Sequence, residues 1–422
     1  MKNSKKKKNK NYFFTKLFTA LIILILPFFV GLKIVEINKS DMFSKSFLLY
    51  KEILFITLLV LLSINLIILI KNRKIKVSVK SFATVAMFLL FVVLEITGSL
   101  KLVYYNDDFK TWLITTSVGS INYKYVAANV YSEKTIEQVI DTEAKKVDID
   151  FTKDIVKYDD LVYENVHYKN ELEEEILKHE KGEKYKILKI SGTTIGADYH
   201  YEGYMAVVYD PADVKLAKSA GAGTFEGSFG ETLGTIAYKS RALVAMNAGG
   251  FYDPNWNSNG GIPHGTVIID GKIQSEYTRG INSGGLIGFD YNNKMVLGRM
   301  SAQEAIDRGV RDAVDWGPYL IVDGVNYFGN INYYTWTCAR TAIGQRADGV
   351  VLLLVIDGLQ AHSKGASYAD LAAVMEKYGA VNASSLDGGT STAMYTNGQY
   401  INKPFNGYYP TFRWLPNAWV VK

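Results

Sequence analysis

The chain has 422 residues, a formal net charge of +5 at pH 7 and a single cysteine, Cys338. One cysteine excludes an intrachain disulfide, so a folded domain must be stabilised by its own core, in which Cys338 is expected as a buried thiol. Two clusters of basic residues, at residues 2–10 and 71–80, lie beside apolar segments, and the rest of the chain lacks alternating basic and aromatic residues. This pattern argues against a nucleic-acid-binding protein.

Three long apolar segments occupy the N-terminal part of the chain, at about residues 13–35, 47–70 and 81–102. Each is long enough to cross a bilayer core of about 30 Å as a helix. Basic residues precede the first segment and separate the second from the third, which predicts that both stretches stay in the cytoplasm. We therefore expect residues 1–103 to form a multi-pass anchor in the cell membrane. The lipid bilayer would be a partner, the N-terminus cytoplasmic and the C-terminal part extracellular.

A charge-dense, glycine-poor segment follows at residues 104–184. It is typical of a partly helical, solvated segment, and we expect it to form an extracellular stalk. From Tyr185 the composition changes to short apolar segments separated by glycines and aromatic residues. We therefore predict a separate domain over residues 185–422.

Short apolar segments alternate with helix signals in this domain. Capping boxes begin two predicted helices, Ser301 with Glu304 and Ser367 with Asp370. The predicted fold class is α+β, with a mixed, largely antiparallel sheet flanked by helices. Strands are expected at 186–191, 204–209, 242–246, 267–269, 271–274, 286–289, 350–356 and 381–386, and helices at 232–239, 301–307 and 367–378.

Two of the predicted helix–strand units end in similar glycine turns. One turn reads Asn247-Ala248-Gly249-Gly250 and the other Leu386-Asp387-Gly388-Gly389. If the units are related, both turns would lie at one edge of a shared sheet. Chance similarity of two such units is the alternative.

The second turn combines an acid, glycines and hydroxyl groups. Gly388 and Gly389 let the backbone turn sharply and bring its N–H groups close to a ligand, while Asp387, Thr390 and Ser391 stand beside them. This combination suits an oxygen-rich ligand such as a sugar or a phosphate. A plain β-turn without a ligand is the alternative.

Further candidate groups end or precede apolar segments. Asp253 and Asp357 follow such segments, as functional groups of α/β enzymes often do. Arg340 precedes the 350–356 strand and has the geometry to hold a phosphate through two hydrogen bonds. A surface ion pair is the alternative for this arginine.

The joint order of these motifs resembles the phosphodiester glycosidase family, over about residues 185–422. The resemblance implies hydrolysis of a sugar-1-phosphodiester, with catalytic roles for Asp387, Asp357 and Arg340. The resemblance and the glycine turns together give the predicted substrate-binding residues: Asn247, Gly249, Gly250, Phe251, Thr341, Gly388, Gly389, Thr390 and Ser391. The motifs that carry the resemblance are Asn247–Phe251, Gly317-Pro318, Arg340–Gly344, Asp357-Gly358 and Leu386–Ser391.

Two positions depart from the family pattern. Thr390 stands where a third glycine is usual, and His264 lies between Pro263 and Gly265 where an apolar residue is expected. We include His264 as a substrate-binding candidate specific to this chain. A histidine at the rim of the site, without chemistry, is the alternative.

The chemistry of the bond supports the same assignment. The phosphate half of a sugar-1-phosphodiester is a good leaving group, so the protein has to stabilise the charge of the phosphate and to supply a nucleophile. Arg340 and the N–H groups of Gly388 and Gly389 suit the first task. Asp387 or Asp357 suits the second, as the base for water or as the nucleophile itself.

One loop after the first glycine turn has the pattern of a metal site. Asp253, Asn255 and Asn257 alternate like the ligands of a calcium loop, but Ser258 stands where such a loop needs glycine and His264 where it needs glutamate. Calcium is therefore an alternative to a polar loop facing a glycan. The sequence requires no cofactor.

The predicted function is an extracellular, membrane-anchored hydrolase that cleaves the C1–O bond of sugar-1-phosphodiesters in cell-envelope or capsular glycans. Two other classes stay open. A non-catalytic glycan-binding module would not need Arg340 and both aspartates. A phosphodiesterase that cuts the P–O bond would need a cluster of metal ligands, whereas His200, His264 and His362 form no ligand-spaced pair.

Overall fold

The computed structural model divides the chain into two units, Met1–Ile140 and Asp141–Lys422. In the first unit it describes helices α4 (Asp107–Val118) and α5 (Lys124–Val130). The predicted membrane spans at 13–35, 47–70 and 81–102 lie outside the described residues, and no helix within those residues is long and apolar enough to cross a bilayer. The described residues are 105–118, 124–136, 138–139, 151–157, 168–253, 258–277, 285–330, 337–403 and 412–422.

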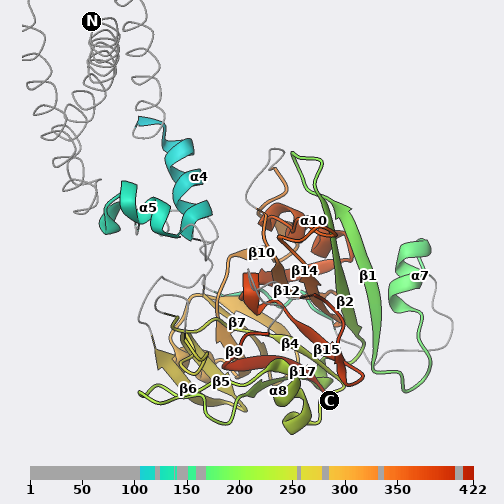
Figure 1. Ribbon diagram of the computed structural model, residues 1–422. Helices are drawn as coiled ribbons and strands as arrows, with labels where there is room; N and C mark the ends of the chain where they lie inside the picture. The colour runs from blue at the N-terminus through green and yellow to red at the C-terminus, as the bar shows by residue number, and fades with distance from the viewer. Residues whose placement is uncertain are drawn as a thin grey trace, which may run out of the picture. The chain divides into compact units, whose positions relative to one another are not determined.

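Three sheets build the second unit, and all of their described strand pairs are antiparallel (Figure 1). The first sheet has the order β1 (Tyr185–Thr193), β2 (His200–Val208), β13 (Val351–Ile356), β12 (Arg340–Arg346), β14 (Ala380–Ser385), β10 (Tyr319–Val322) and β11 (Val325–Asn326). The second has the order β16 (Gln399–Tyr400), β15 (Met394–Thr396), β4 (Val244–Asn247), β17 (Asn417–Val421) and β3 (Val214–Lys218). The third has the order β6 (Lys272–Tyr277), β5 (Gly265–Ile269), β9 (Val310–Asp315), β7 (Leu286–Asp290) and β8 (Met295–Gly298).

Four α-helices accompany these sheets in the described part of the unit: α7 (Glu171–Leu177), α8 (Leu233–Ser240), α9 (Ala302–Asp307) and α10 (Tyr368–Lys377). Both predicted capping boxes are formed, at the starts of α9 and α10. The α+β class and the largely antiparallel pairing are thus confirmed. The expectation of one sheet was wrong, because the short strands distribute over three sheets around a common core.

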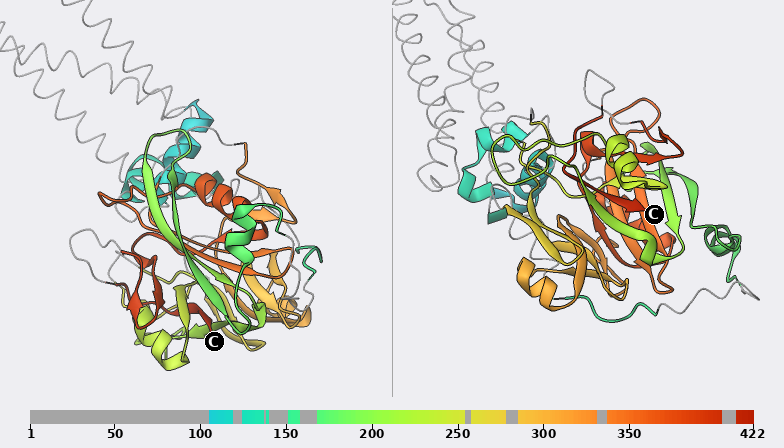
Figure 2. Two further views of the ribbon diagram at one scale, coloured as in Figure 1. Left: turned by 90° about the vertical axis from the view of Figure 1, so that its right-hand side faces the viewer. Right: turned by 90° about the horizontal axis from the view of Figure 1, so that it is seen from below.

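Strand β13 explains how the layers stack. Val351 and Val355 face the core cluster that all three sheets share. Leu352 and Leu354 face the opposite way, toward α10. Because side chains alternate between the faces of a strand, a strand that is apolar throughout must be covered on both sides. The first sheet is covered in this way, and the hairpin of β1 and β2 extends along it (Figure 2).

The other two sheets each carry a helix on the face turned away from the common core. Helix α8 packs on the second sheet, where Ala245 and Ala418 are fully buried. Helix α9 packs on the third, where Ile268 and Ala313 are fully buried. Each sheet therefore contributes one face to the shared core and one to its own helix.

Part of the segment predicted as a stalk contacts this unit. The N–H of Thr152 donates to the carbonyl of Leu297 (3.0 Å), and the N–H of Lys157 donates to that of Ala347 (2.9 Å). Ile176 of α7 is 2% exposed and packs with the residues beneath α10. The folded unit therefore includes residues upstream of Tyr185, while an extended stalk stays a prediction.

The two glycine turns meet although their strands belong to different sheets. Strand β4 lies in the second sheet and β14 in the first. The N–H of Asp387 donates to the carbonyl of Ala248 (3.1 Å), and Nδ2 of Asn247 donates to the carbonyl of Asp387 (2.6 Å). The idea of a single shared sheet was wrong, but the ends of the two strands converge over the common core. This convergence positions the candidate site.

Candidate active site

The sheet order brings the three predicted catalytic residues to one edge. Strand β12 lies between β13 and β14 and runs antiparallel to both. Arg340 begins β12, whereas Asp357 directly follows β13 and Asp387 follows β14 by one residue. A strand start therefore lies between two strand ends. The arginine backbone is flanked by the two segments that carry the acids.

The side chain of Asn247 makes hydrogen bonds to several of the elements around this edge. The residue is 1% exposed. Its Oδ1 accepts hydrogen bonds from Oγ1 of Thr341 (2.9 Å) and from the N–H of Ala393 (3.0 Å), while Nδ2 donates to the carbonyl of Asp387. One side chain thus connects β4, β12, β15 and the acidic turn. These contacts assign Asn247 and Thr341 to holding the turn in place.

The turn at Gly388 and Gly389 requires glycine for two reasons. Gly389 has φ +59°, in the left-handed region, and a Cβ on Gly388 would lie 3.0 Å from the carbonyl oxygen of Ala339. The N–H of Gly389 donates to that same carbonyl (2.8 Å). From the sequence, the N–H of Gly389 was expected to bind a phosphate. In the structure this N–H group is instead used in a hydrogen bond within the protein.

Asp387 is a partly buried carboxyl group with a shifted titration. Burial raises its pKa to about 6, against smaller lowering effects from a hydrogen bond with Ser391, the charge of Arg413 and the N–H of Gly388. The charge of Asp253 raises the pKa slightly further. At neutral pH Asp387 is mostly ionised, yet it is more basic than an ordinary aspartate. Shifted carboxyl groups of this kind concentrate at functional sites.

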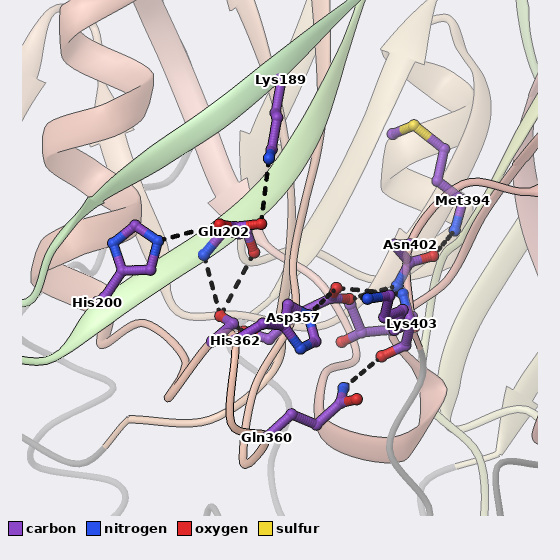
Figure 3. A network of polar contacts seen from close by, with 11 residues as sticks. Lys189, His200, Glu202, Asp357, Gln360, His362, Met394, Asn402 and Lys403 are labelled. Atoms are coloured by element: carbon purple, nitrogen blue, oxygen red, sulfur yellow. Dashed lines mark hydrogen bonds and ion pairs between the residues drawn. The ribbon is translucent and has the colours of Figure 1, made fainter.

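Asp357 has a different environment. It is 4% exposed, and its Oδ1 accepts hydrogen bonds from Nδ2 of Asn402 (3.0 Å) and the N–H of Lys403 (2.9 Å). Its Oδ2 lies 2.9 Å from Nε2 of His362. Figure 3 shows Asp357 between these partners. Both carboxyl oxygens are engaged, so Asp357 ties the 402–403 segment to the end of β13.

Arg340 lies beneath the glycine turn. It is 6% exposed, its Nε donates to the carbonyl of Ala366 (3.1 Å), and its guanidinium carbon is 4.1 Å from the ring centre of Tyr368. A Cβ on Gly388 would lie 3.9 Å from Cδ of Arg340. The stem of Arg340 thus supports the turn, while its head contacts the start of α10. Cys338, the neighbouring thiol, is buried as predicted, and burial raises its pKa.

The first glycine turn is held by side chains at strand ends of the second and third sheets. The N–H of Gly249 donates to Oδ1 of Asn417 (2.9 Å). A Cβ on Gly250 would lie 2.1 Å from the ring of Trp316, so only glycine fits there. The N–H of His264 donates to the carbonyl of Gly250 (2.9 Å), which places His264 beside this turn.

The imidazole of His264 is largely removed from water in this position. Burial lowers its pKa, and the charge of Asp315 opposes that shift only in part. Its ring lies edge-on to Trp316, with 6.3 Å between ring centres. Within the described residues, Nδ1 of His264 and Oγ1 of Thr390 are both buried without a hydrogen-bond partner.

The sequence did not predict Arg413. Its Nη2 donates to Oδ2 of Asp253 (2.6 Å), and its guanidinium carbon lies 4.9 Å from the ring centre of Phe251. Asp253 also accepts the N–H of Ser258 through Oδ1 (2.7 Å). No motif marked Arg413. The available signal was a single charge between two aromatic residues, Phe412 and Trp414.

The calcium alternative concerns Asp253, Asn255 and Asn257. Asn255 and Asn257 lie outside the described residues. Among the residues that are described, no three His, Cys, Asp or Glu side chains gather in a way that would hold a metal ion. The observed partners of Asp253 are instead an arginine and a backbone N–H group.

Comparisons with known proteins support the family suggested by the motifs. A family model described as phosphodiester glycosidase matches residues 240–422. The SPbeta prophage-derived uncharacterized protein YomE of Bacillus subtilis (strain 168) is 31% identical over 186 residues, which cover 42% of this chain and 28% of that protein. This chain thus spans less than a third of that relative.

Two solved structures are also similar. The zebrafish N-acetylglucosamine-1-phosphodiester alpha-N-acetylglucosaminidase catalytic domain, auto-inhibited by its pro-peptide, has 21% identity and a TM-score of 0.48, over 58% of this chain and 85% of that one. A putative exported protein of Burkholderia pseudomallei K96243 has 18% identity and a TM-score of 0.37, over 53% and 74%. Residues 240–422, which contain every motif of the predicted site, match the phosphodiester glycosidase family.

Proposed function

We propose that the second unit hydrolyses the glycosidic C1–O bond of a sugar-1-phosphodiester. The observation that carries this proposal is the state of Asp387, a partly buried carboxyl group with a pKa of about 6 on a turn fixed by Asn247. Such a group is ionised at neutral pH and still basic enough to accept a proton. Its placement within the matched family domain supports a hydrolytic role.

The proposed reaction has two routes with the same products. In one, Asp387 removes a proton from water as the water oxygen bonds to C1 of the sugar. In the other, Asp387 attacks C1 itself, and water then hydrolyses the glycosyl ester. In both, the C1–O bond breaks with its electron pair on the phosphate oxygen. The products are the free sugar and a phosphomonoester.

The contacts favour Asp387 over Asp357 for this step. Asp357 contacts Asn402, Lys403 and His362 through both oxygens, so attack on a substrate would require these contacts to break. Burial raises the pKa of Asp387 to about 6, and the residue as a whole is partly exposed. We therefore assign Asp387 to the reaction and Asp357 to the support of the site.

We further propose that the substrate is a cell-envelope or capsular glycan outside the cell. This part rests on the apolar and basic pattern of residues 1–103. Protease added to intact cells should remove the part of the chain after about residue 102. Protection of that part, with cleavage of the N-terminus instead, would contradict the orientation.

Hydrolysis in water enriched in heavy oxygen tests the chemistry. Label in the released sugar supports attack at C1, whereas label in the phosphate would mean P–O cleavage and a phosphodiesterase. Asp387→Asn should abolish turnover, and Asp198→Asn is a matched control because Asp198 is exposed in the β1–β2 connection. Binding of sugar phosphates without turnover on any of them would favour a glycan-binding module.

A further inference from the structure

We propose that Arg413 is the residue that binds the phosphate group of the substrate, and that Asp253 holds this arginine in position until the phosphate arrives. The proposal rests on the proposed function, because it names the group that recognises the charged half of the phosphodiester. It transfers to Arg413 the role that the motif pattern suggested for Arg340.

The first argument is the place of Arg413 beside the reacting turn. Arg413 stacks on Phe251, with 4.9 Å between its guanidinium carbon and the ring centre. Phe251 ends the same glycine segment whose Ala248 carbonyl accepts the N–H of Asp387. The arginine and the proposed catalytic acid are therefore supported by one short stretch of backbone.

The second argument is electrostatic. The charges of Arg413 and Asp253 act on Asp387 in opposite directions, the first lowering and the second raising its pKa. Because the interaction between charges weakens with distance, these effects indicate that the Arg413–Asp253 pair and the Asp387 carboxyl group share one electrostatic environment. A phosphate bonded to a sugar C1 that faces Asp387 would therefore be attracted by the charge of Arg413.

The third argument is the supply of free donors. A guanidinium has five N–H groups. Within the described residues, Arg413 makes one hydrogen bond, from Nη2 to Asp253. The remaining donors suit two oxygens of a phosphate, which arginine prefers to bind through paired hydrogen bonds. Arg340, by contrast, directs its Nε to the carbonyl of Ala366 and its planar face to Tyr368.

Asp253 completes this arrangement. The side chains of Arg413 and Asp253 are 12% and 11% exposed, so neither charge is fully solvated. Burial of an arginine is tolerable only with a counter-charge, and Asp253 supplies it before substrate binds. The N–H of Ser258 fixes the other oxygen of Asp253. An incoming phosphate would take over part of the pairing.

The experiment compares two substrates that share one sugar. One is a glycosyl phosphodiester, and the other is the 4-nitrophenyl glycoside, which lacks phosphate. Measurements at pH 8 keep Asp387 ionised when the charge of Arg413 is removed. The full-length variants are Arg413→Gln and Arg413→Lys. The matched control is Arg308→Gln, because exposed Arg308 also lies 4.9 Å from a phenylalanine ring centre, that of Phe151, but on the third sheet beside α9.

We expect Arg413→Gln to raise KM for the phosphodiester at least about tenfold, as for the loss of a hydrogen bond to a charged group. Its kcat/KM on the nitrophenyl glycoside should change less than about threefold. The KM of Arg413→Lys for the phosphodiester should lie between those of the wild type and Arg413→Gln, since lysine keeps the charge but cannot form the paired hydrogen bonds. An unchanged KM for the phosphodiester, or equal losses on both substrates, would overturn the proposal.

Failure of the proposed function has a separate signature. If the wild-type protein hydrolyses neither substrate, calorimetric titration with inorganic phosphate and with glycerol phosphate decides the inference. Binding that is lost in Arg413→Gln and kept in Arg308→Gln supports an anion site at Arg413. Equal binding by all three proteins, or no binding by the wild type, overturns it.

Discussion

Two aspartates of the first sheet have nearly the same local sequence and very different environments. Asp357 and Asp387 each come at the end of a buried strand, are followed by glycine and flank the start of β12. The oxygens of Asp357 are engaged by Asn402, Lys403 and His362. Asp387 instead has a pKa raised by burial to about 6. The partners beyond the strand, rather than the strand and its turn, set the environment of each carboxyl group.

The difference also separates two ways in which a protein uses a buried carboxyl group. A buried carboxyl group whose oxygens accept several hydrogen bonds stabilises the fold, because removing the carboxyl group leaves the buried donors without an acceptor. Incomplete compensation of burial makes the group basic and available for proton transfer. The predictions that follow test whether Asp387 and Asp357 behave as these two types.

The largest effect is expected for Asp387→Asn. Loss of the primary carboxylate should raise the activation barrier by about 3 kcal/mol or more, which is about 150-fold or more in kcat/KM. Circular dichroism and thermal unfolding should show an intact fold. Near-normal turnover in the folded variant would show that Asp387 does not take part in the reaction. It would also contradict the proposed difference between Asp387 and Asp357.

Asp357→Asn should instead act on stability. The amide group offers one acceptor where the carboxyl group offered two, so Asn402, Lys403 or His362 loses its partner in a buried place. We expect the free energy of unfolding to fall by about 2–3 kcal/mol. Denaturant titration measures this change. A variant of normal stability that has lost all turnover would show that Asp357, and not Asp387, takes part in the reaction.

The pH profile should follow Asp387. If its ionised form acts as base or nucleophile, kcat/KM rises through about pH 6, by roughly tenfold between pH 5 and 7. Initial rates across this range on a phosphodiester, which stays anionic throughout, give the profile. A flat profile in this range would show that no group with this pKa controls the reaction.

The same shift has a consequence for folding. The folded pKa of about 6 lies above the ordinary value of 3.8, so the stabilising contribution of this group is complete below pH 3.8 and is lost as pH rises through 6. Asp387→Asn should therefore gain stability relative to the wild type between pH 4 and 7. An opposite trend in denaturant titrations would contradict the raised pKa.

Arg340→Lys should show whether the arginine of this edge acts by shape or by charge alone. Lysine keeps the charge but loses the Nε bond to Ala366 and the stacking on Tyr368, so we expect lower activity and about 1 kcal/mol less stability. Its KM should change less than that of Arg413→Gln. A large and selective KM effect at Arg340 would return the phosphate-binding role to it.

The sequence predicted those parts of this site that depend on local patterns. The apolar segment before Asp357, the capping box at Ser367 and the glycine turn after Asp387 each have a signature within a few residues. The family resemblance was confirmed by the family model that matches residues 240–422. The predicted membrane anchor lies outside the described residues and stays a prediction.

The remaining features depend on contacts between distant segments. Asn402 and Lys403 reach Asp357 from about 45 positions further along the chain, and Arg413 reaches Asp253 across 160. The separation of β4 and β14 into different sheets depends on which short strands pair. Which strands pair depends on how their side chains pack together in the core, and the sequence of a single segment does not show its packing partners.

The smallest expected effects come from removing one partner from each acid. Ser391→Ala deletes a hydrogen bond that lowers the pKa of Asp387, so the midpoint of the pH profile should move to higher pH while stability changes little. His362→Gln removes the imidazole beside Asp357 and should cost about 1 kcal/mol of stability without moving the midpoint. If Asp387 reacts and Asp357 stabilises the fold, Ser391→Ala changes the midpoint of the pH profile and His362→Gln changes the free energy of unfolding. Initial rates and denaturant titrations on both variants measure these two quantities. Equal shifts of the midpoint in both would mean that the two acids titrate as one coupled system, and that the distinction between them fails.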